Sequence, residues 1–395
     1  MWFSCQLGAR EHYAVPRALQ LGGLLREFST DLWIRPNVLT RRWRNKLSGR
    51  FHPELAHARV NAANAATLSF QIESQIRGLG GWQLTVRRND WFQRNVLARL
   101  SRRERELDRR PATVFAYSYA AEQIFNYARE RGWRTVLGQI DPGPAEESIV
   151  SRLRATGSGN AWQPAPAEYW RKWRNECELA DQIVVNSAWS RKELVREGIP
   201  ETKIRVIPLA FEPRKQAEGF ERAYPAVFTA VRPLKVLFLG QVNLRKGAEA
   251  LLEAARLLAE ETIEFWFVGP RQIQLAPDLN SKHNVKFFGA VPRMEVDRFY
   301  RDADVFILPT LSDGFGLTQL EAQSWKLPVI ASRFCGEVVE HGRNGLILAQ
   351  VSGEEIAKVL SELLGASHRL AAMSRQSYVQ KNFSLQSLAS SLSQL

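Results

Sequence analysis

Short apolar runs alternate with amphipathic helical patterns along the second half of the chain. The runs are rich in β-branched and aromatic residues and cover residues 234–239, 263–268, 285–288, 305–308 and 328–331. Between the first two runs, one helical face collects Ala248, Leu251, Leu252, Ala255 and Leu258, which recur at steps of three and four. This alternation is typical of βαβ units and predicts a parallel sheet covered by helices.

The first half shows the same pattern less regularly. It predicts buried strands at residues 113–116, 135–137, 183–185 and 204–207. Pro213, Gly219 and Pro225 interrupt the pattern within residues 212–227, which predicts a linker. A chain of 395 residues also exceeds the roughly 250–300 residues that one core supports. We therefore expect an α/β protein with two Rossmann-like domains facing a cleft, residues 1–212 and 228–369, and a helical segment at about 370–395 that packs back onto the first.

The composition is that of an ordinary globular protein, with 45% hydrophobic and 24% charged residues. No apolar stretch approaches the roughly 18 residues of a membrane span, and the first residues lack the basic start of a signal peptide. Cys5, Cys177 and Cys335 are odd in number and far apart, which favours a reducing compartment over disulfides or a metal site. We expect a cytoplasmic protein without a bound metal.

The net charge of +13 is concentrated at the start of the chain, because residues 1–110 hold 20 basic and 9 acidic residues. Two stretches dominate, from Arg35 to Arg50 and from Arg87 to Arg110. In the second stretch an apolar helical face is formed by Phe92, Val96, Leu100 and Leu107. Ten of the twelve Trp residues precede residue 190, and Trp with cationic side chains suits lipid headgroups. The pattern indicates an anionic membrane surface at the cytoplasmic face, or a solvated helix packed on its own domain; nucleic acid is less favoured, because no recognised binding motif accompanies the charge.

The densest chemical signal directly follows the strand at 305–308. Asp313-Gly314-Phe315-Gly316-Leu317 forms a glycine-bearing turn before a helix, where unpaired backbone N–H groups attract phosphate or hydroxyl oxygens. Asp313 and Glu321 could address opposite ends of a polyhydroxylated ligand. The plain alternative makes Asp313 a helix cap and Glu321 a solvated residue.

A basic turn follows the strand at 234–239 and contains Gly240, Gln241, Arg245, Lys246 and Gly247. Ligands of open α/β sheets bind at the carboxyl ends of the strands, so this turn and the turn at Asp313 should face one crevice. Cations for a diphosphate and carboxylates for sugar hydroxyls then make one coherent site. The alternative is a solvated turn.

Residues 234–348 resemble the C-terminal domain of the GT-B glycosyltransferases of family 4, which move a sugar from a nucleotide sugar with retention of anomeric configuration. The resemblance rests on the two turns, on Val268-Gly269-Pro270, and on residues 285–289, 304–309, 328–331 and 342–346. It extends more thinly to residues 176–208. It implies that Lys246 binds the diphosphate with the amides of Phe315, Gly316 and Leu317, that Asp313 lies near the transferred sugar, and that Glu321 binds the ribose. It requires no metal, and the co-substrate would be a UDP- or GDP-sugar.

Three positions depart from the family pattern. Asp313 stands where the family usually has Glu, Gln241 replaces a common donor-binding Arg, and Gln139 and Asp141 stand where a His is often found. On the acceptor side, Gly8, Arg10 and His12 follow the apparent first strand and could face the donor phosphates. Candidates for the first domain's contribution are therefore Gly8, Arg10, His12, Gln139 and Asp141.

The expected function is a retaining, metal-independent hexosyltransferase with a glycan, lipid-linked or other cell-envelope acceptor. The departures keep open a catalytically weak or silent nucleotide-sugar-binding scaffold of the same fold. A dinucleotide oxidoreductase is disfavoured because no G-x-G-x-x-G follows a strand.

Overall fold

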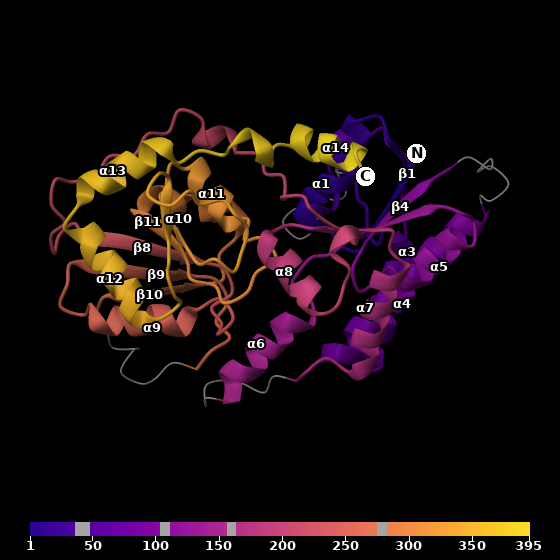
Figure 1. The fold of residues 1–395 in the computed structure, drawn as a ribbon, viewed down its shortest axis with the longest axis horizontal. Coiled ribbons are helices and arrows are strands. Elements are labelled where there is room, and N and C mark those ends of the chain that lie inside the picture. The colour runs from indigo at the N-terminus through magenta and orange to yellow at the C-terminus, as the bar shows by residue number, and fades with distance from the viewer. Residues whose placement is uncertain (36–47, 103–110, 156–162, 275–282) are drawn as a thin grey trace.

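The computed structural model describes residues 1–35, 48–102, 111–155, 163–274 and 283–395, and it contains two parallel sheets side by side (Figure 1). The first sheet has the order β3-β2-β1-β4-β5-β6-β7 and the second β10-β9-β8-β11-β12-β13. The first sheet is built from β1 (Trp2–Gln6), β2 (Leu25–Thr30), β3 (Val60–Ala62), β4 (Thr113–Tyr117), β5 (Arg134–Gly138), β6 (Gln182–Val185) and β7 (Ile204–Val206). The second is built from β8 (Leu234–Leu239), β9 (Ile263–Val268), β10 (Val285–Gly289), β11 (Val305–Leu308), β12 (Val329–Ala331) and β13 (Gly345–Ile347).

Helices connect the strands of each sheet. Those of the first half are α1 (Ala14–Leu21), α3 (Asn64–Ile76), α4 (Gly81–Arg102), α5 (Glu122–Arg129), α6 (Pro144–Ala155), α7 (Ala167–Leu179) and α8 (Ala188–Arg196). Those of the second half are α9 (Ala248–Leu257), α10 (Val296–Asp302), α11 (Thr318–Ser324), α12 (Gly353–Leu364), α13 (Ser367–Gln376) and α14 (Leu385–Ser393). All strand pairs are parallel, which confirms the expected α/β class with two Rossmann-like sheets.

The strands could be predicted from the sequence because their side chains form the apolar cores of the two sheets. In the second half, alternate positions of β8 and β9 bury Phe238, Phe265 and Phe267 almost completely, and Leu251 of α9 closes the same cluster. The expected strands at 234–239, 263–268 and 305–308 coincide with β8, β9 and β11. Apolar runs that are buried on both faces are typical of parallel sheets.

Three strands were not expected from the pattern: β2, β3 and β13. In β2 the buried positions are largely polar, since Glu27, Ser29 and Thr30 are each at most 4% exposed. The other two strands have only three residues each. Polar burial and short length both hide a strand from a search for apolar runs.

The C-terminal segment crosses from the second half of the molecule to the first, as its yellow ribbon shows in Figure 1. Leu370 and Met373 of α13 join the core of the second half. After a short 3-10 turn (Lys381–Phe383), Leu388 and Leu392 of α14 pack with Ala18 of α1 in the first half. The segment at about 370–395, expected to be helical and to pack on the first domain, therefore forms two helices: α13 packs on the second half and α14 on the first.

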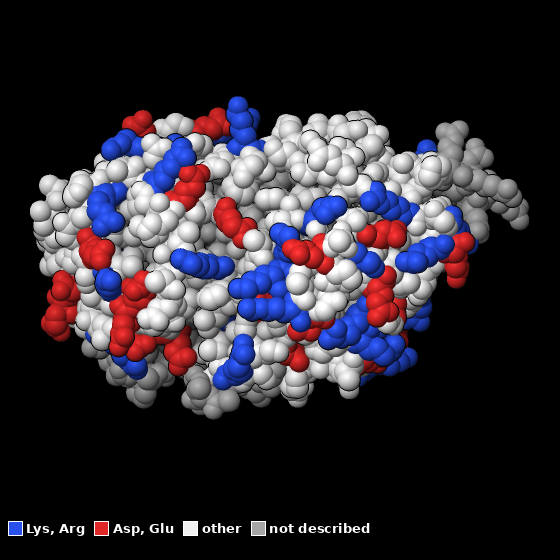
Figure 2. All heavy atoms as spheres, in the orientation of Figure 1, with Lys and Arg blue, Asp and Glu red and all other residues white. Residues whose placement is uncertain are grey.

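The basic helix α4 uses its apolar face inside its own domain. Phe92, Val96 and Leu100 are at most 3% exposed and belong to the core that covers β4 and β5. Leu107, the basic stretch at 36–47 and Arg103 to Arg110 lie outside the described residues. Figure 2 shows Lys and Arg side chains gathered over α4 and α7, with acidic side chains between them. Within the described range, the charged face of α4 is therefore the one accessible to a partner, because its apolar face is buried.

Candidate active site

The loops that follow β8 and β11 pack tightly on one another at the carboxyl edge of the second sheet. Gly247 has φ +72° and ends the β8 loop, and a Cβ built on it would lie 1.8 Å from the carbonyl oxygen of Pro309 in the β11 loop. No other residue type fits this approach without moving the backbone. The two loops predicted to share a site are therefore adjacent.

Lys246 and Asp313 meet where these loops touch, and they form an ion pair. Burial acts to raise the pKa of Asp313, but the positive charges of Lys246 and Arg245, with hydrogen bonds from Lys246 and the Phe315 backbone, outweigh it and hold the pKa below its usual range. Asp313 therefore carries a full negative charge at neutral pH. Asp313 does not cap a helix, because the cap position of α11 is Leu317.

The turn from Gly314 to Leu317 is fixed by its neighbours. A Cβ on Gly314 would lie 2.1 Å from the carbonyl oxygen of Ile140 in the other domain, and Gly316 has φ +82°. Phe315 is 3% exposed and contacts Gly336 and Phe383. Among the described residues, the backbone N–H groups of Gly316 and Leu317 donate to no acceptor. The turn thus presents free amides next to the Lys246–Asp313 pair.

Glu321 lies on the first turn of α11 and lines a cavity of about 520 Å³ between the two domains. Its carboxylate accepts a hydrogen bond of 2.7 Å from the Tyr300 hydroxyl. Burial, together with the negative charge of Glu321, raises the pKa of Tyr300 well above its ordinary value, so this hydroxyl remains a donor. Tyr300 orients Glu321, whose other carboxylate oxygen has no hydrogen-bond donor among the described residues.

His12 lines this same cavity from the first domain. It sits in the 3-10 turn Arg10–Tyr13, where Glu11, His12 and Tyr13 have φ of 49°, 51° and 61°. Three consecutive non-glycine residues in the left-handed region are rare and mark a strained, positioned loop. Burial and the positive charges of Arg293, then of other nearby cationic groups, lower the pKa of His12 to about 4, so the imidazole is neutral at pH 7.

The other candidates of the first domain are arranged differently. Arg10 is exposed and lines a small cavity of about 130 Å³ together with Asp141, whereas Gly8 donates its N–H to Asp31. Gln139 is 1% exposed. Its amide N–H donates to Asp141, and its amide oxygen accepts a hydrogen bond from the indole N–H of Trp173. Gln139 is therefore not open to a ligand and instead holds Asp141 in place.

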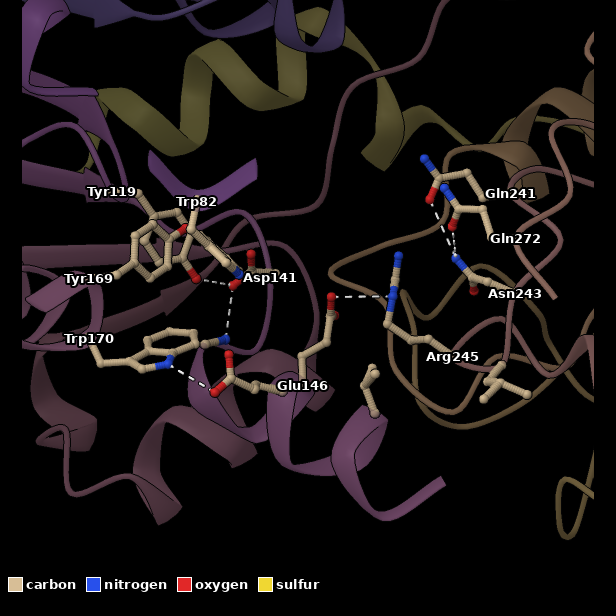
Figure 3. Close-up of a pocket in the computed structure, with 14 residues that line it drawn as sticks. Trp82, Tyr119, Asp141, Glu146, Tyr169, Trp170, Gln241, Asn243, Arg245 and Gln272 are labelled. Atoms are coloured by element: carbon tan, nitrogen blue, oxygen red, sulfur yellow. Dashed lines mark hydrogen bonds and ion pairs between the residues drawn. The ribbon is translucent and has the colours of Figure 1, made fainter. Parts of the chain in front are cut away.

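A second cavity of about 280 Å³ lies between the domains on the side of Asp141 and Arg245 (Figure 3). Its first-domain wall is formed by Trp82, Tyr119, Asp141, Gly143, Glu146, Glu147, Val150, Tyr169 and Trp170. Its second-domain wall is formed by Gln241, Asn243, Leu244, Arg245 and Gln272. The sequence singled out Gln241, Arg245 and Asp141 but none of the aromatic residues. Their only signal was the high Trp content of the first half.

Glu146 is the most consequential residue that the sequence did not reveal. It bridges the domains by an ion pair of 3.3 Å to Arg245 and by a hydrogen bond of 3.3 Å from Ser312. Burial, with the negative charges of Asp141 and Asp313, raises the pKa of Glu146 to about 7 in spite of the opposing positive charge of Arg245. Arg245 also donates to the carbonyl oxygen of Ser312 at 2.7 Å, which fixes its guanidinium in the cleft.

Residues 233–366, which carry both loops, match the family model described as glycosyl transferases group 1. This part of the chain is similar to the group 1 glycosyltransferases. The chain is 27% identical over 196 residues to the amylovoran biosynthesis glycosyltransferase AmsK of Erwinia amylovora, covering 46% of each chain. It is 26% identical over 279 residues to a D-inositol 3-phosphate glycosyltransferase of Nocardia farcinica, covering 66% of this chain and 60% of that protein. The chain thus spans about half the length of the curated relatives it matches.

Solved structures show the same GT-B fold over the whole chain. Sucrose-phosphate synthase from Thermosynechococcus elongatus superimposes with a TM-score of 0.67 at 16% identity, covering 100% of this chain and 98% of that one. HepE from Anabaena, solved in complex with UDP-glucose, superimposes with a TM-score of 0.60 at 16% identity, covering 100% and 99%. Among the described helices, none combines the length and the apolar composition needed to cross a membrane.

Proposed function

We propose that the protein is a retaining, metal-independent hexosyltransferase that moves a sugar from a nucleoside diphosphate sugar to a glycan, lipid-linked or other cell-envelope acceptor. The observation that carries the proposal is the arrangement of Lys246, Asp313 and Arg245 beside free backbone amides at the carboxyl edge of the second sheet. The division into an acceptor-side domain, residues 1–212, and a donor-side domain, residues 228–369, is part of the same proposal.

In this proposal the donor diphosphate takes the place of Asp313 as the main partner of Lys246. The bond from the sugar to the diphosphate breaks as negative charge grows on the leaving phosphate, and fixed cations and amide dipoles stabilise that charge. Lys246 and the amides of Gly316 and Leu317 would fill this role, with Gly240, Gln241 and Gly247 in the loop around them. Glu321, oriented by Tyr300, would accept hydrogen bonds from the ribose hydroxyls.

Asp313 would serve the transferred sugar. It is one methylene shorter than the Glu common in the family, and the charges of Lys246 and Arg245 with the Phe315 backbone N–H hold its pKa below the usual range. An ionised carboxylate beside the anomeric carbon stabilises positive charge that develops there. The neutral imidazole of His12, on the opposite wall, can accept a hydrogen bond from a sugar hydroxyl or donate one.

The names of relatives support the class of donor and acceptor. The similar HepE was solved with UDP-glucose, the relative AmsK is named for biosynthesis of a polysaccharide, and a similar structure is named a lipopolysaccharide outer core galactosyltransferase. A UDP-sugar is therefore the donor to test first, ahead of a GDP-sugar.

An anionic membrane surface is the proposed place of action, at the cytoplasmic face. The observation that favours it is α3, whose Leu68, Ile72 and Ile76 are 58%, 58% and 81% exposed although they recur at every fourth position. The inward positions of this helix hold Thr67 and Ser74 instead, which are buried. An apolar stripe turned to solvent on a helix that packs on the basic α4 through Phe70 and Trp91 suits a lipid headgroup region.

The proposed function is tested by thermal shift and donor turnover. Ligand bound only to the native state raises the melting midpoint, so a midpoint raised by one nucleoside diphosphate identifies the donor base without an acceptor. Release of UDP or GDP from the matching nucleotide sugar then separates an enzyme from a silent binder of the same fold. A midpoint unchanged by UDP, GDP and ADP would contradict the proposal, and a shift by an oligonucleotide alone would favour nucleic acid.

A further inference from the structure

The cavity of Figure 3 has a chemical character that differs from the donor loops. One wall carries the rings of Trp82, Tyr119, Tyr169 and Trp170, and these rings contact one another. The Tyr119 and Tyr169 rings stack with centroids 4.7 Å apart, and the Trp82 ring lies 4.8 Å from Tyr169. A rigid aromatic wall of this kind offers apolar area with little loss of side-chain entropy on binding.

The aromatic wall is held by a buried support. Glu176 of α7 is 1% exposed and accepts backbone N–H bonds from Tyr119, Ala121 and Glu122. These bonds hold Tyr119 at φ +74°, a conformation that costs a non-glycine residue free energy. The Tyr119 hydroxyl donates to Asp141 at 2.5 Å, so the ring and the carboxylate are fixed as one unit. Strain held by a buried carboxylate points to a positioned ligand-contacting ring.

The cavity also carries hydrogen-bonding atoms that the protein does not use. Among the described residues, Asp141 Oδ2 and the side-chain amide nitrogens of Gln241 and Gln272 have no partner. They come from both domains and line the same cavity. Few, convergent polar groups beside apolar walls are the usual composition of a small-ligand site, and about 280 Å³ lies near the lower end of such sites.

The charge of the lining selects against anions. Asp141, Glu146 and Glu147 supply three carboxyl groups, whereas Arg245 is the only Lys or Arg among the described lining residues and is paired with Glu146. A phosphate or uronate bound against the aromatic wall would meet mostly negative charge, because Arg245 belongs to the opposite, second-domain wall. A neutral pyranose matches the site, because its C–H face packs on aromatic rings and its hydroxyls can both donate to Asp141 and accept from the two amides.

Resting on the proposed function, we infer that this cavity binds the acceptor, and that the unit bound is a neutral saccharide and not a phosphorylated or acidic one. The aromatic wall recognises the sugar ring, and Asp141 with Gln241 and Gln272 recognises its hydroxyls. Lys246 and Asp313 remain on the donor side. A lipid-linked acceptor then presents its terminal neutral sugar to this cavity and its phosphates elsewhere.

The test is saturation-transfer NMR on the full chain with methyl glycosides of glucose, galactose, mannose and N-acetylglucosamine. The probes are compared with glucuronic acid and glucose 6-phosphate, in the presence of saturating UDP. We expect at least one neutral glycoside to bind and both anionic probes to bind at least tenfold more weakly. In Tyr169→Ala the binding falls at least tenfold, and Tyr169→Phe, which keeps the ring, restores most of it. Tyr378→Ala removes an exposed ring of the other domain and is the matched control.

UDP affinity, measured separately for each variant, keeps the two proposals apart. Unchanged UDP binding in Tyr169→Ala with lost glycoside binding supports the inference. Equal glycoside binding in wild type and Tyr169→Ala, a preference for the anionic probes, or no glycoside bound at all would overturn it while leaving the donor site intact. Absence of nucleotide binding in the wild type would contradict the proposed function and not the saccharide site.

Discussion

Arg245 and Glu146 form an ion pair of 3.3 Å that connects the donor loop of one domain to the first turn of α6 in the other. The Glu146 carboxylate is paired with the Arg245 guanidinium, which a donor diphosphate would also attract. Because burial raises the pKa of Glu146 to about 7, this competition changes within the physiological pH range. Under the proposed function, domain contact and donor binding would be coupled through this one titratable side chain.

Donor affinity should fall as pH rises through about 7. Below the pKa, Glu146 is neutral and Arg245 is free to meet the diphosphate; above it, the carboxylate competes and adds negative charge to the cleft. Glu146→Gln should bind donor more tightly above pH 7 and lose the dependence between pH 6 and 8. The ligand is a nucleotide sugar measured by calorimetry, because the terminal phosphate of a free nucleoside diphosphate itself titrates at about pH 6.

Glu147→Gln is the matched control for the pH experiment. Glu147 is the next residue of α6 and bonds to Trp170 and to the Ala165 backbone, not to Arg245. The pH dependence should survive in this variant. A Glu146→Gln protein with an unaltered pH profile would show that the ion pair does not compete with the donor.

The sequence predicted that the β8 and β11 loops lie together because its signals there are local. A strand, a glycine-bearing turn and a helix follow within a few residues, and the turn chemistry of Gly247 and Gly316 is required by backbone contacts that the structure shows. The pairing of Lys246 with Asp313 follows from two adjacent strands whose carboxyl ends meet. Short-range pattern and sheet topology together were sufficient.

The first-domain side could not be predicted in the same way. Its wall joins Trp82 of α4, Tyr119 after β4 and Tyr169 of α7, which lie far apart in sequence and meet only in the fold. Gln139 was expected to face the ligand, yet its hydrogen bonds to Asp141 and Trp173 bury it. Side-chain direction after a strand is set by such tertiary contacts, which no local pattern encodes.

Gly314→Ala should slow transfer while leaving nucleotide binding unchanged. The new Cβ would lie 2.1 Å from the carbonyl oxygen of Ile140, so the domains must separate. Misplacing reacting groups by about 1 Å can cost about a hundredfold in rate, and we expect a loss of at least tenfold in kcat. The measurement is sugar transfer together with UDP affinity. Gly80→Ala, at a position open to solvent, is the control. Unchanged kcat would mean that this domain approach is not needed for catalysis.

Lys246→Gln and Glu321→Gln should each weaken donor binding by roughly 10- to 100-fold, the range for losing a hydrogen bond to a charged group. Glutamine is preferred to alanine at position 321 because its amide oxygen still accepts a hydrogen bond from the Tyr300 hydroxyl. Alanine would leave that buried hydroxyl without a partner. Melting midpoints should therefore change little at Glu321. Lys358→Gln, on the exposed face of α12, controls for loss of positive charge. A sharp fall in melting midpoint with unchanged nucleotide affinity would make both residues structural.

Replacing the exposed stripe of α3 should release the protein from anionic vesicles. The triple variant Leu68→Gln, Ile72→Gln and Ile76→Gln removes apolar area without touching the core, because all three side chains point to solvent. Binding to vesicles of phosphatidylglycerol and phosphatidylcholine, measured by sedimentation, should fall at least tenfold, since each buried apolar side chain contributes about 1 kcal/mol or more. Leu257→Gln, equally exposed on α9 of the other domain, should bind as the wild type does. If vesicle binding weakens with salt but is as strong in the triple variant as in the wild type, the membrane contact is made by the arginines of α4 alone.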